Sequence, residues 1–193
     1  MKRTLVLSAL MLSLGLSACV PLVVVGGVAI GAWIGSDPRK TAMIKEDTSL
    51  GANISAKIID EWKELAHMNV NTFNGVVLLT GELPSVEAQN KAVVMAKSFP
   101  QTRKVYNETV VAPPSSAVDR MNDSQITTRV KSAVMLQVKD GASVHVQVIT
   151  ERGVVYLLGV ATPEIANQIA TVAASTSGVL QVVKLVDSSL IGQ

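Results

Sequence analysis

The sequence predicts an α+β protein of two tandem domains, each with the element order αββαβ. Three observations predict this fold. Residues 75–105 align without a gap to residues 153–183, and ten of the 31 aligned positions are identical, which indicates duplication of one domain. Each copy follows a stretch of helical periodicity and ends in a valine-rich segment. Between the copies, residues 113–116 are Pro-Pro-Ser-Ser, a composition that interrupts a strand and marks a linker.

Each repeat begins with a predicted helix. In the first repeat the helical spacing starts after Thr48 or Ser49, and in the second it starts after Asp123 or Ser124; these residue types are good helix N-caps. Apolar residues at intervals of three and four form one face of each helix, which we expect to pack on the core. These faces are Ile54, Ile58, Trp62 and Leu65 in the first repeat, and Ile126, Val130, Ala133 and Val134 in the second.

A β-hairpin is predicted after each helix. Apolar and polar residues alternate in MNVNT of the first repeat and in VHVQV of the second, which is the pattern of a half-buried strand. The dipeptides Asn74-Gly75 and Arg152-Gly153 then provide tight turns into VVLLTG and VVYLLG.

A helix and a last strand complete each repeat. The segments SVEAQNKAVVMAKS and PEIANQIATVAAST have an alanine-rich apolar side, which is typical of a helix packed on a sheet. Each is followed by a strand-like segment, KVYNETVV or VLQVVKLVD. A right-handed crossover should bring this strand in parallel to its neighbour. Each domain is therefore predicted to be a three-stranded mixed sheet with two helices on one face.

The first residues of the chain have the anatomy of a secretion signal. Lys2 and Arg3 form a basic start, an apolar run follows, and the small residues Ser17 and Ala18 precede Cys19. The tetrapeptide Leu-Ser-Ala-Cys resembles the lipobox of bacterial lipoproteins. This resemblance implies cleavage before Cys19 and a covalent N-acyl and S-diacylglycerol lipid on its amine and thiol. A lone cysteine in an exported protein cannot form an internal disulfide, so acylation explains its presence.

The segment between the cysteine and the first helix has two parts. Residues 20–35 carry no charge, but they are too few and too rich in glycine for a spanning helix, so we expect a segment at the membrane surface or a loosely ordered leash. Residues 36–49 carry mixed charge and a proline, as linkers do. The predicted organisation is a signal peptide (1–18), a lipidated N-terminus and linker (19–47), a first domain (48–112), a linker (113–118) and a second domain (119–193).

Charge and composition argue against a nucleic-acid partner. The chain has 17 basic and 15 acidic residues, and Lys2 and Arg3 leave with the leader. The mature chain is therefore balanced in charge. It has neither a basic tract nor a ladder of aromatic residues, which are the features that bind phosphate backbones and stack on bases.

The repeat and its flanks resemble a known family. The αββαβ unit with the motif GVVxLxG and a closing valine strand resembles the BON domain. A lipobox, an apolar segment with glycines, the tripeptide Asp37-Pro38-Arg39 and two such repeats are similar to the outer-membrane lipoproteins of Gram-negative bacteria that carry two BON domains. The resemblance implies a non-enzymatic lipoprotein that is anchored in the outer membrane, faces the periplasm and supports outer-membrane integrity. It also implies that the second BON domain binds anionic phospholipid.

Residues that could carry catalysis or bind a metal are few. His67 and His145 each stand at the first strand of a repeat, and His145 is expected on the solvent side with Gln147, because the valines of VHVQV share the other face. Neither histidine has a second ligand at metal-binding spacing. We therefore predict no catalytic residue, no metal, no cofactor besides the covalent lipid, and no small-molecule substrate.

The first helix of the second domain offers a candidate lipid-binding surface. With the apolar stripe inward, Lys131 and Met135 lie four residues apart on the outer side, and Arg129 and Leu136 lie on a flank. A helix at a membrane surface needs cations for lipid phosphates and apolar side chains for the headgroup boundary. These four residues are the predicted contacts with an anionic phospholipid membrane. Gln125, just before them, is not the aromatic anchor that would strengthen such contact.

Two functions remain open on the sequence alone. The first is a tethered module that binds lipid through its second domain. The alternative is a tethered adaptor whose BON domains hold an envelope protein partner or a cell-wall component. Binding of the unacylated chain to anionic vesicles would favour the first, whereas binding only to proteins would favour the second.

Overall fold

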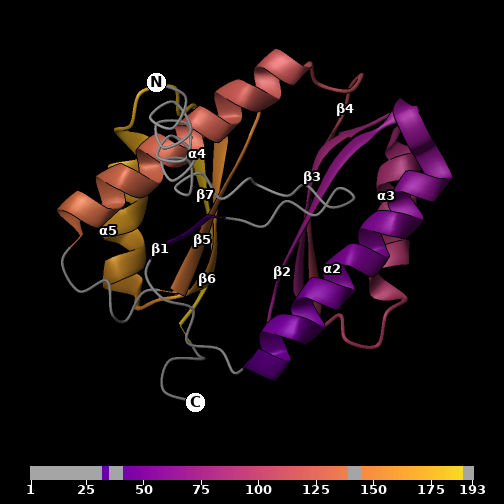
Figure 1. Ribbon diagram of the computed structural model, residues 1–193, viewed down its shortest axis with the longest axis horizontal. Coiled ribbons are helices and arrows are strands. Elements are labelled where there is room, and N and C mark those ends of the chain that lie inside the picture. Colours follow the sequence, from indigo (N-terminus) through magenta and orange to yellow (C-terminus); the bar gives the residue numbers. More distant parts are fainter. Residues whose placement is uncertain (1–31, 35–40, 139–144, 189–193) are drawn as a thin grey trace, which may run out of the picture.

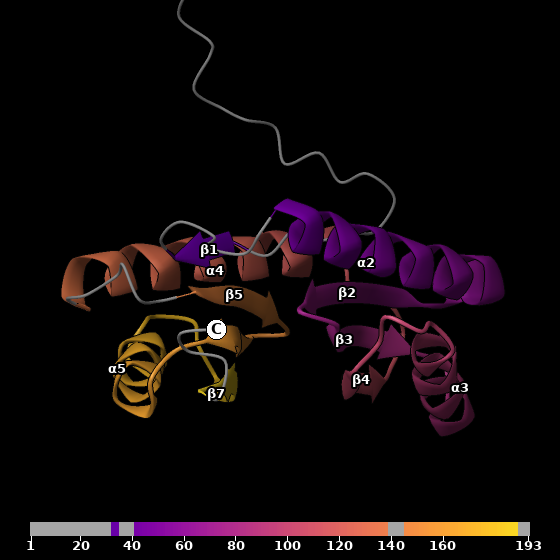
Figure 2. The same cartoon turned by 90° about the horizontal axis from the view of Figure 1, so that it is seen from below.

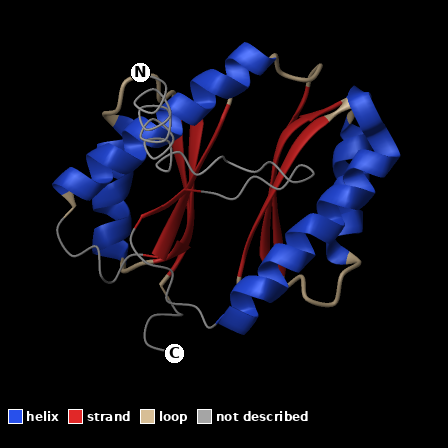
Figure 3. Ribbon diagram, in the orientation of Figure 1, coloured by secondary structure: helices blue, strands red, loops and turns tan. Residues whose placement is uncertain are grey.

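The computed structural model describes residues 32–34, 41–138 and 145–188 (Figure 1). The predicted signal peptide and Cys19 lie outside these residues. Two β-sheets pack face to face at the centre of the molecule, and helices cover the outer face of each sheet (Figure 3). The layers are therefore helix, sheet, sheet and helix, with one repeat on each side. Among the helices in the described ranges, none combines the length and apolar character needed to cross a membrane.

The first repeat has the predicted element order. Its elements are α2 (Thr41–Trp62), a 3₁₀ turn (Lys63–Leu65), β2 (His67–Phe73), β3 (Val76–Leu83), α3 (Val86–Lys97) and β4 (Lys104–Val111). β2 pairs antiparallel with β3, and β3 pairs parallel with β4 after the crossover through α3. The sheet is therefore mixed and three-stranded, as predicted, with both helices on one face (Figure 1).

The second repeat follows the same plan. Its elements are α4 (Ala117–Gln137), β5 (His145–Glu151), β6 (Val154–Val160), α5 (Pro163–Ala174) and β7 (Gln181–Asp187). β5 and β6 are antiparallel, and β6 and β7 are parallel. The two repeats thus share one topology, which confirms the duplication inferred from the aligned segments.

The second sheet also has a fourth strand that the sequence analysis did not predict. β1 (Ala32–Ile34) pairs antiparallel with the outer edge of β5. These three residues belong to the segment 20–35, which was expected to lie at the membrane surface or to form a leash. A strand of three residues is too short to show an alternating pattern, so periodicity could not identify it.

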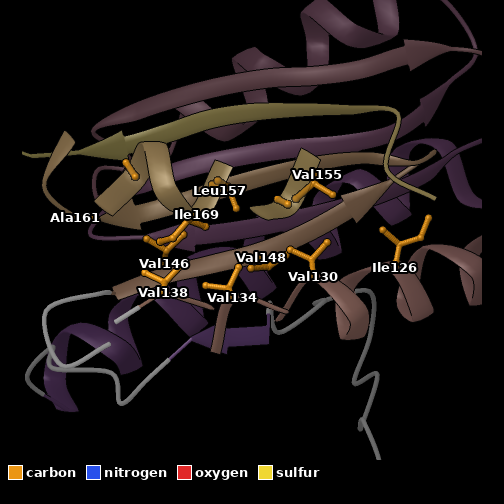
Figure 4. Packing of buried hydrophobic residues seen from close by; sticks show 12 residues of the cluster. Ile126, Val130, Val134, Val138, Val146, Val148, Val155, Leu157, Ala161 and Ile169 are labelled. Atoms are coloured by element: carbon orange, nitrogen blue, oxygen red, sulfur yellow. The ribbon is translucent and has the colours of Figure 1, made fainter. Parts of the chain in front are cut away.

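α4 packs on its sheet through the predicted stripe. Ile126, Val130 and Val134 are buried against β5, β6 and α5 (Figure 4). The stripe of α2 is buried in the same way, except at its last predicted member. Leu65 is 68% exposed, because α2 ends at Trp62 and the 3₁₀ turn that follows changes the period from about 3.6 to about 3.0 residues.

Both first helices begin earlier than predicted. α2 begins at Thr41, inside the range predicted to be linker. α4 is capped by Ser116 and not by Asp123 or Ser124. Ser116 and Asp119 exchange hydrogen bonds between side chain and backbone in a capping box, which satisfies N–H groups that the first turn leaves free. The opening turns of both helices lie outside the apolar stripes, so apolar periodicity missed them.

The hairpin turns are as predicted. Asn74 and Gly75 have φ angles of 49° and 72°, and Arg152 and Gly153 have φ angles of 52° and 73°. A two-residue turn that matches the twist of its strands needs positive φ at both central positions. The glycine in each turn takes this conformation without the steric cost of a Cβ atom.

The inner faces of the two sheets form a core between the domains. The prediction that His145 and Gln147 face solvent is therefore wrong, because Gln147 is only 5% exposed and His145 is partly buried. Alternation placed them correctly opposite the valines of β5, but the face on which they lie is covered by the other domain. The apolar part of this core consists of Phe73, Leu78, Ile149, Tyr156, Leu158 and Val160.

Candidate membrane-contact surface

The four predicted lipid-binding residues all lie on the outside of α4. Met135 and Leu136 are 65% and 86% exposed, Arg129 is exposed and Lys131 is partly exposed. At about 100° per residue, Arg129 and Leu136 lie on one flank of the exposed face, and Lys131 and Met135 lie on the other. Each flank therefore combines one cation with one apolar side chain.

The exposed face of α4 is longer than the sequence predicted. Val118 and Met121 are 60% and 56% exposed and lie in the first turns of the helix. By helical spacing, Met121 lies on the same side as Met135, and Val118 lies on the flank of Arg129. Neither residue was predicted, because α4 begins at Ala117 and not after Asp123 or Ser124. We call the following set the α4 surface: Val118, Met121, Arg129, Lys131, Met135 and Leu136.

Acidic residues do little to offset the positive charge of this surface. Asp123 is 8% exposed, so its carboxylate is turned inward. Asp119 is exposed and stays ionised, because hydrogen bonds from the Ser116 side chain and backbone lower its pKa, but it lies in the first turn of α4, more than two turns before Arg129. On the equivalent helix α2, Asp60 and Glu61 are exposed, and Glu61 forms an ion pair with Lys91. Of the two first helices, α4 therefore presents the outer face better suited to an anionic surface.

A buried aspartate fixes each first helix to the hairpin of its own repeat. The Asp123 carboxylate accepts hydrogen bonds from the backbone N–H groups of Arg152 at 2.8 Å and Gly153 at 2.9 Å. Asp47 of α2 makes the same two bonds to the turn between β2 and β3, at 2.7 Å and 2.9 Å. From the sequence, Asp123 was expected only as a helix cap. Asp47 stands 28 residues before Gly75 and Asp123 stands 30 residues before Gly153, so the spacing differs between the repeats and an alignment without gaps does not pair the two aspartates.

We expect Asp123→Ala to lower the free energy of unfolding by about 2 kcal/mol. The change leaves two N–H groups without their acceptor at a turn where Arg152 is exposed and Gly153 is buried, and each such loss costs about 1 kcal/mol. Asp123→Asn, which keeps one acceptor oxygen, should show an intermediate loss in urea unfolding. Asp60→Ala is the matched control, because that carboxylate is exposed on α2. Equal stability of Asp123→Ala and the control would contradict this role.

Two buried glutamates, one from each domain, accept hydrogen bonds from residues outside their own domain. Glu82 of β3 is 0% exposed, and it accepts hydrogen bonds from Arg152 Nη1 at 3.2 Å and from the Ser115 N–H at 3.1 Å. Glu151 of β5 is 4% exposed, and it accepts a hydrogen bond from Asn69 Nδ2 at 2.7 Å. The first domain thus places a carboxylate against the second, and the second places one against the first. We call these five residues the interdomain junction.

The interdomain junction disfavours the charged form of Glu151. Burial is the largest effect and raises the pKa of Glu151 to about 7, although the hydrogen bond from Asn69 lowers it. The negative charges of Glu82 and Asp123 add to the rise. Burial also lowers the pKa of the neighbouring His67. Near neutral pH, the junction therefore contains a carboxyl group that can be protonated or ionised.

The fold also brings a histidine close to two carboxylates. In the described part of the chain, ligating atoms of His67, Glu82 and Glu151 lie within 4.8 Å of one another. Both carboxylates already accept hydrogen bonds from groups across the domain boundary or in the linker, so the chemistry evident here is that of domain docking. Spacing along the chain could not reveal this group, because its members come from different strands of both repeats.

Two relatives match most of the chain. The chain is 36% identical over 172 residues to the outer membrane lipoprotein DolP of Haemophilus influenzae, covering 88% of each chain. It is 32% identical over 153 residues to the 21 kDa hemolysin of Actinobacillus pleuropneumoniae, covering 78% of each chain. A solved structure of CdsD, a structural protein of the type III secretion system of Chlamydia trachomatis, is 13% identical with a TM-score of 0.28, and covers 72% of this chain and 91% of that one. A likeness this weak says nothing further about the protein.

Both repeats match the same domain family. The BON domain matches residues 46–113 and 122–187, which contain most of α2 and α4 and all the strands of the two αββαβ units. Together with the relative of similar length, the two matches confirm the resemblance noted in the sequence. The chain belongs to the family of outer-membrane lipoproteins that carry two BON domains.

Proposed function

We propose that the protein is a non-enzymatic lipoprotein that binds anionic phospholipid through the α4 surface of its second BON domain and so supports outer-membrane integrity. The lipid on Cys19 holds it at the outer membrane, on the periplasmic side. This location agrees with membership of the family and with the name of the Haemophilus relative. Since the whole length of that relative is nearly matched, the proposal concerns the protein as a unit.

One observation carries the assignment to α4. Two cations and four exposed apolar side chains of the α4 surface lie on the outside of a single helix, in which Asp123 is turned inward and Asp119 lies in the first turn, away from the two cations. Each cation near an anionic bilayer contributes about 1 kcal/mol to binding, and apolar side chains add burial in the headgroup boundary. The covalent lipid keeps this surface at high local concentration near the bilayer, so each contact can be weak.

Charge reversal on α4 tests the proposal. We expect Arg129→Glu with Lys131→Glu to weaken binding to anionic vesicles at least about 30-fold, because two lost cations remove about 2 kcal/mol. Flotation should use the whole mature chain without lipid. An isolated second domain would expose the inner face of its sheet, which is a core between the domains.

Lys45→Glu with Lys63→Glu is the matched control, because it makes the same charge change on exposed positions of the first repeat. It should bind vesicles like the unaltered chain. Equal loss in both variants would mean that net charge and not the α4 surface governs binding. Binding to envelope proteins by a chain that never floats with vesicles would support the adaptor function.

A further inference from the structure

We propose that the outer edge of β5 is a docking surface for the N-terminal segment of this same chain, and that the docked strand β1 holds α4 close to the lipid anchor. The occupant is residues 32–34. The consequence for the membrane rests on the proposed lipid at Cys19, whereas the docking itself does not.

The two repeats differ at one edge of their sheets. β2 is an edge strand of the first sheet, whereas the equivalent strand β5 is covered by β1. An open edge offers unpaired N–H and C=O groups to any strand that can add to it. In the second repeat the chain's own N-terminal segment uses these groups. The register places Ala32 opposite Val148, Trp33 opposite Gln147 and Ile34 opposite Val146.

The docked strand lies next to the candidate membrane-contact helix. β1 contacts both β5 and α4, and Figure 2 shows it on the side of the molecule that carries the two first helices, α2 and α4. The second helices of the repeats, α3 and α5, lie on the opposite side (Figure 2). The chain that leads back to the anchor therefore leaves the described fold beside α4.

Docking also shortens the connection between anchor and domain. Only residues 20–31 separate Cys19 from β1, and a chain of that length spans at most about 45 Å. Without docking, the connection would run to Thr41 at the start of α2 and could span about 75 Å. If β1 left the edge of β5, the anchor would be connected directly to the first domain, whose α2 exposes acidic residues. β1 thus determines which domain is tied directly to the bilayer.

A disulfide trap tests the docking. In a Cys19→Ser background, Ala32→Cys with Val148→Cys places two thiols on opposed positions of neighbouring strands, where mild oxidation should join them. Ala32→Cys with Gln147→Cys is the control, because a shift of one residue puts the two thiols on opposite faces of the sheet. We expect a disulfide in the first variant only. No disulfide in either variant, or equal yields in both, would overturn the docking.

Energy transfer to labelled lipid tests the consequence. The lipidated chain is placed in neutral vesicles, so that α4 is not attracted by lipid charge. A dye is attached at Ser132→Cys on α4 or at Gln168→Cys on α5, and both positions are exposed. We expect stronger transfer from position 132. Ala32→Pro with Trp33→Pro removes at least one N–H that faces β5, whichever of the alternate residues provides it, and should reduce this difference by at least half.

The control for the strand variant is Val24→Pro with Val25→Pro, which adds two prolines outside β1 and should leave the difference unchanged. A difference that survives the prolines in β1 would overturn the proposed role of docking. Failure of the lipid anchor would be seen separately, because an unacylated Cys19 would take up the dye in the chain without an introduced cysteine.

Discussion

Replacing Cys19 with alanine is expected to remove the stable anchor in the outer membrane and to leave only the weak contact of the α4 surface. The protein should be released as a soluble periplasmic form or remain as an uncleaved precursor, because under the proposed function processing and acylation would both act at this cysteine. Buried methylene groups of acyl chains contribute about 0.8 kcal/mol each, so several chains hold a protein firmly where one chain is marginal. Fractionation of the envelope measures the location, and mass spectrometry distinguishes the two forms.

Ser17→Thr is a suitable control, because it alters the same cleavage region without removing the thiol. It should fractionate with the outer membrane. If the Cys19→Ala protein stayed entirely in the outer membrane as well, the lipobox assignment would fail. The α4 surface or residues 20–35 would then have to provide attachment without the covalent lipid.

The element order could be predicted because its signals are local. The turn residues Asn74-Gly75 and Arg152-Gly153, the alternation in the hairpin strands and the helical stripe at Ile126, Val130 and Val134 each depend on neighbours a few residues away. Duplication then strengthened every local signal, because the same pattern occurred twice. Helix starts were less certain, since caps such as Ser116 leave no trace in apolar periodicity.

The contact between the sheets could not be predicted in this way. Asn69 of β2 bonds to Glu151 across the boundary, and Asn71 of β2 and Gln147 of β5 are buried; all three are polar, so the faces that carry them resemble surfaces exposed to water. Alternation shows which residues share a face of a strand, but not whether water or a second sheet covers that face. The buried Glu82 and Glu151 follow the same rule, because their partners come from the other domain or the linker.

Only part of the α4 surface could be predicted, because only part of it depends on neighbours within one helix. Arg129, Lys131, Met135 and Leu136 follow from the position of the stripe on one helix. Val118 could be added only when the true start of α4 was known. β1 beside this helix depends on pairing between residues far apart in the chain, for which a segment of three residues carries no signal of its own.

Glu151→Gln is expected to stabilise the protein above neutral pH and to change little at pH 5. The ordinary pKa of the group is 4.5 and the folded value is about 7, so between these values the folded state keeps a proton that the unfolded state has released. Stability therefore falls as pH rises through this window, by about 3 kcal/mol in total. Glutamine removes this loss, because it stays neutral and keeps an acceptor oxygen for Asn69.

Urea unfolding of both proteins between pH 5 and pH 8 measures this difference. The pKa of His67 is lowered in the folded state, so this residue makes the protein less stable as pH falls. His67 is present in both proteins, and its effect on stability largely cancels in the comparison. Glu64→Gln, at an exposed position after α2, should leave the pH dependence unchanged. Parallel curves for Glu151→Gln and the unaltered chain would show that Glu151 ionises in the folded state as easily as in water. In that case the docking of the two domains would not depend on the protonation of Glu151.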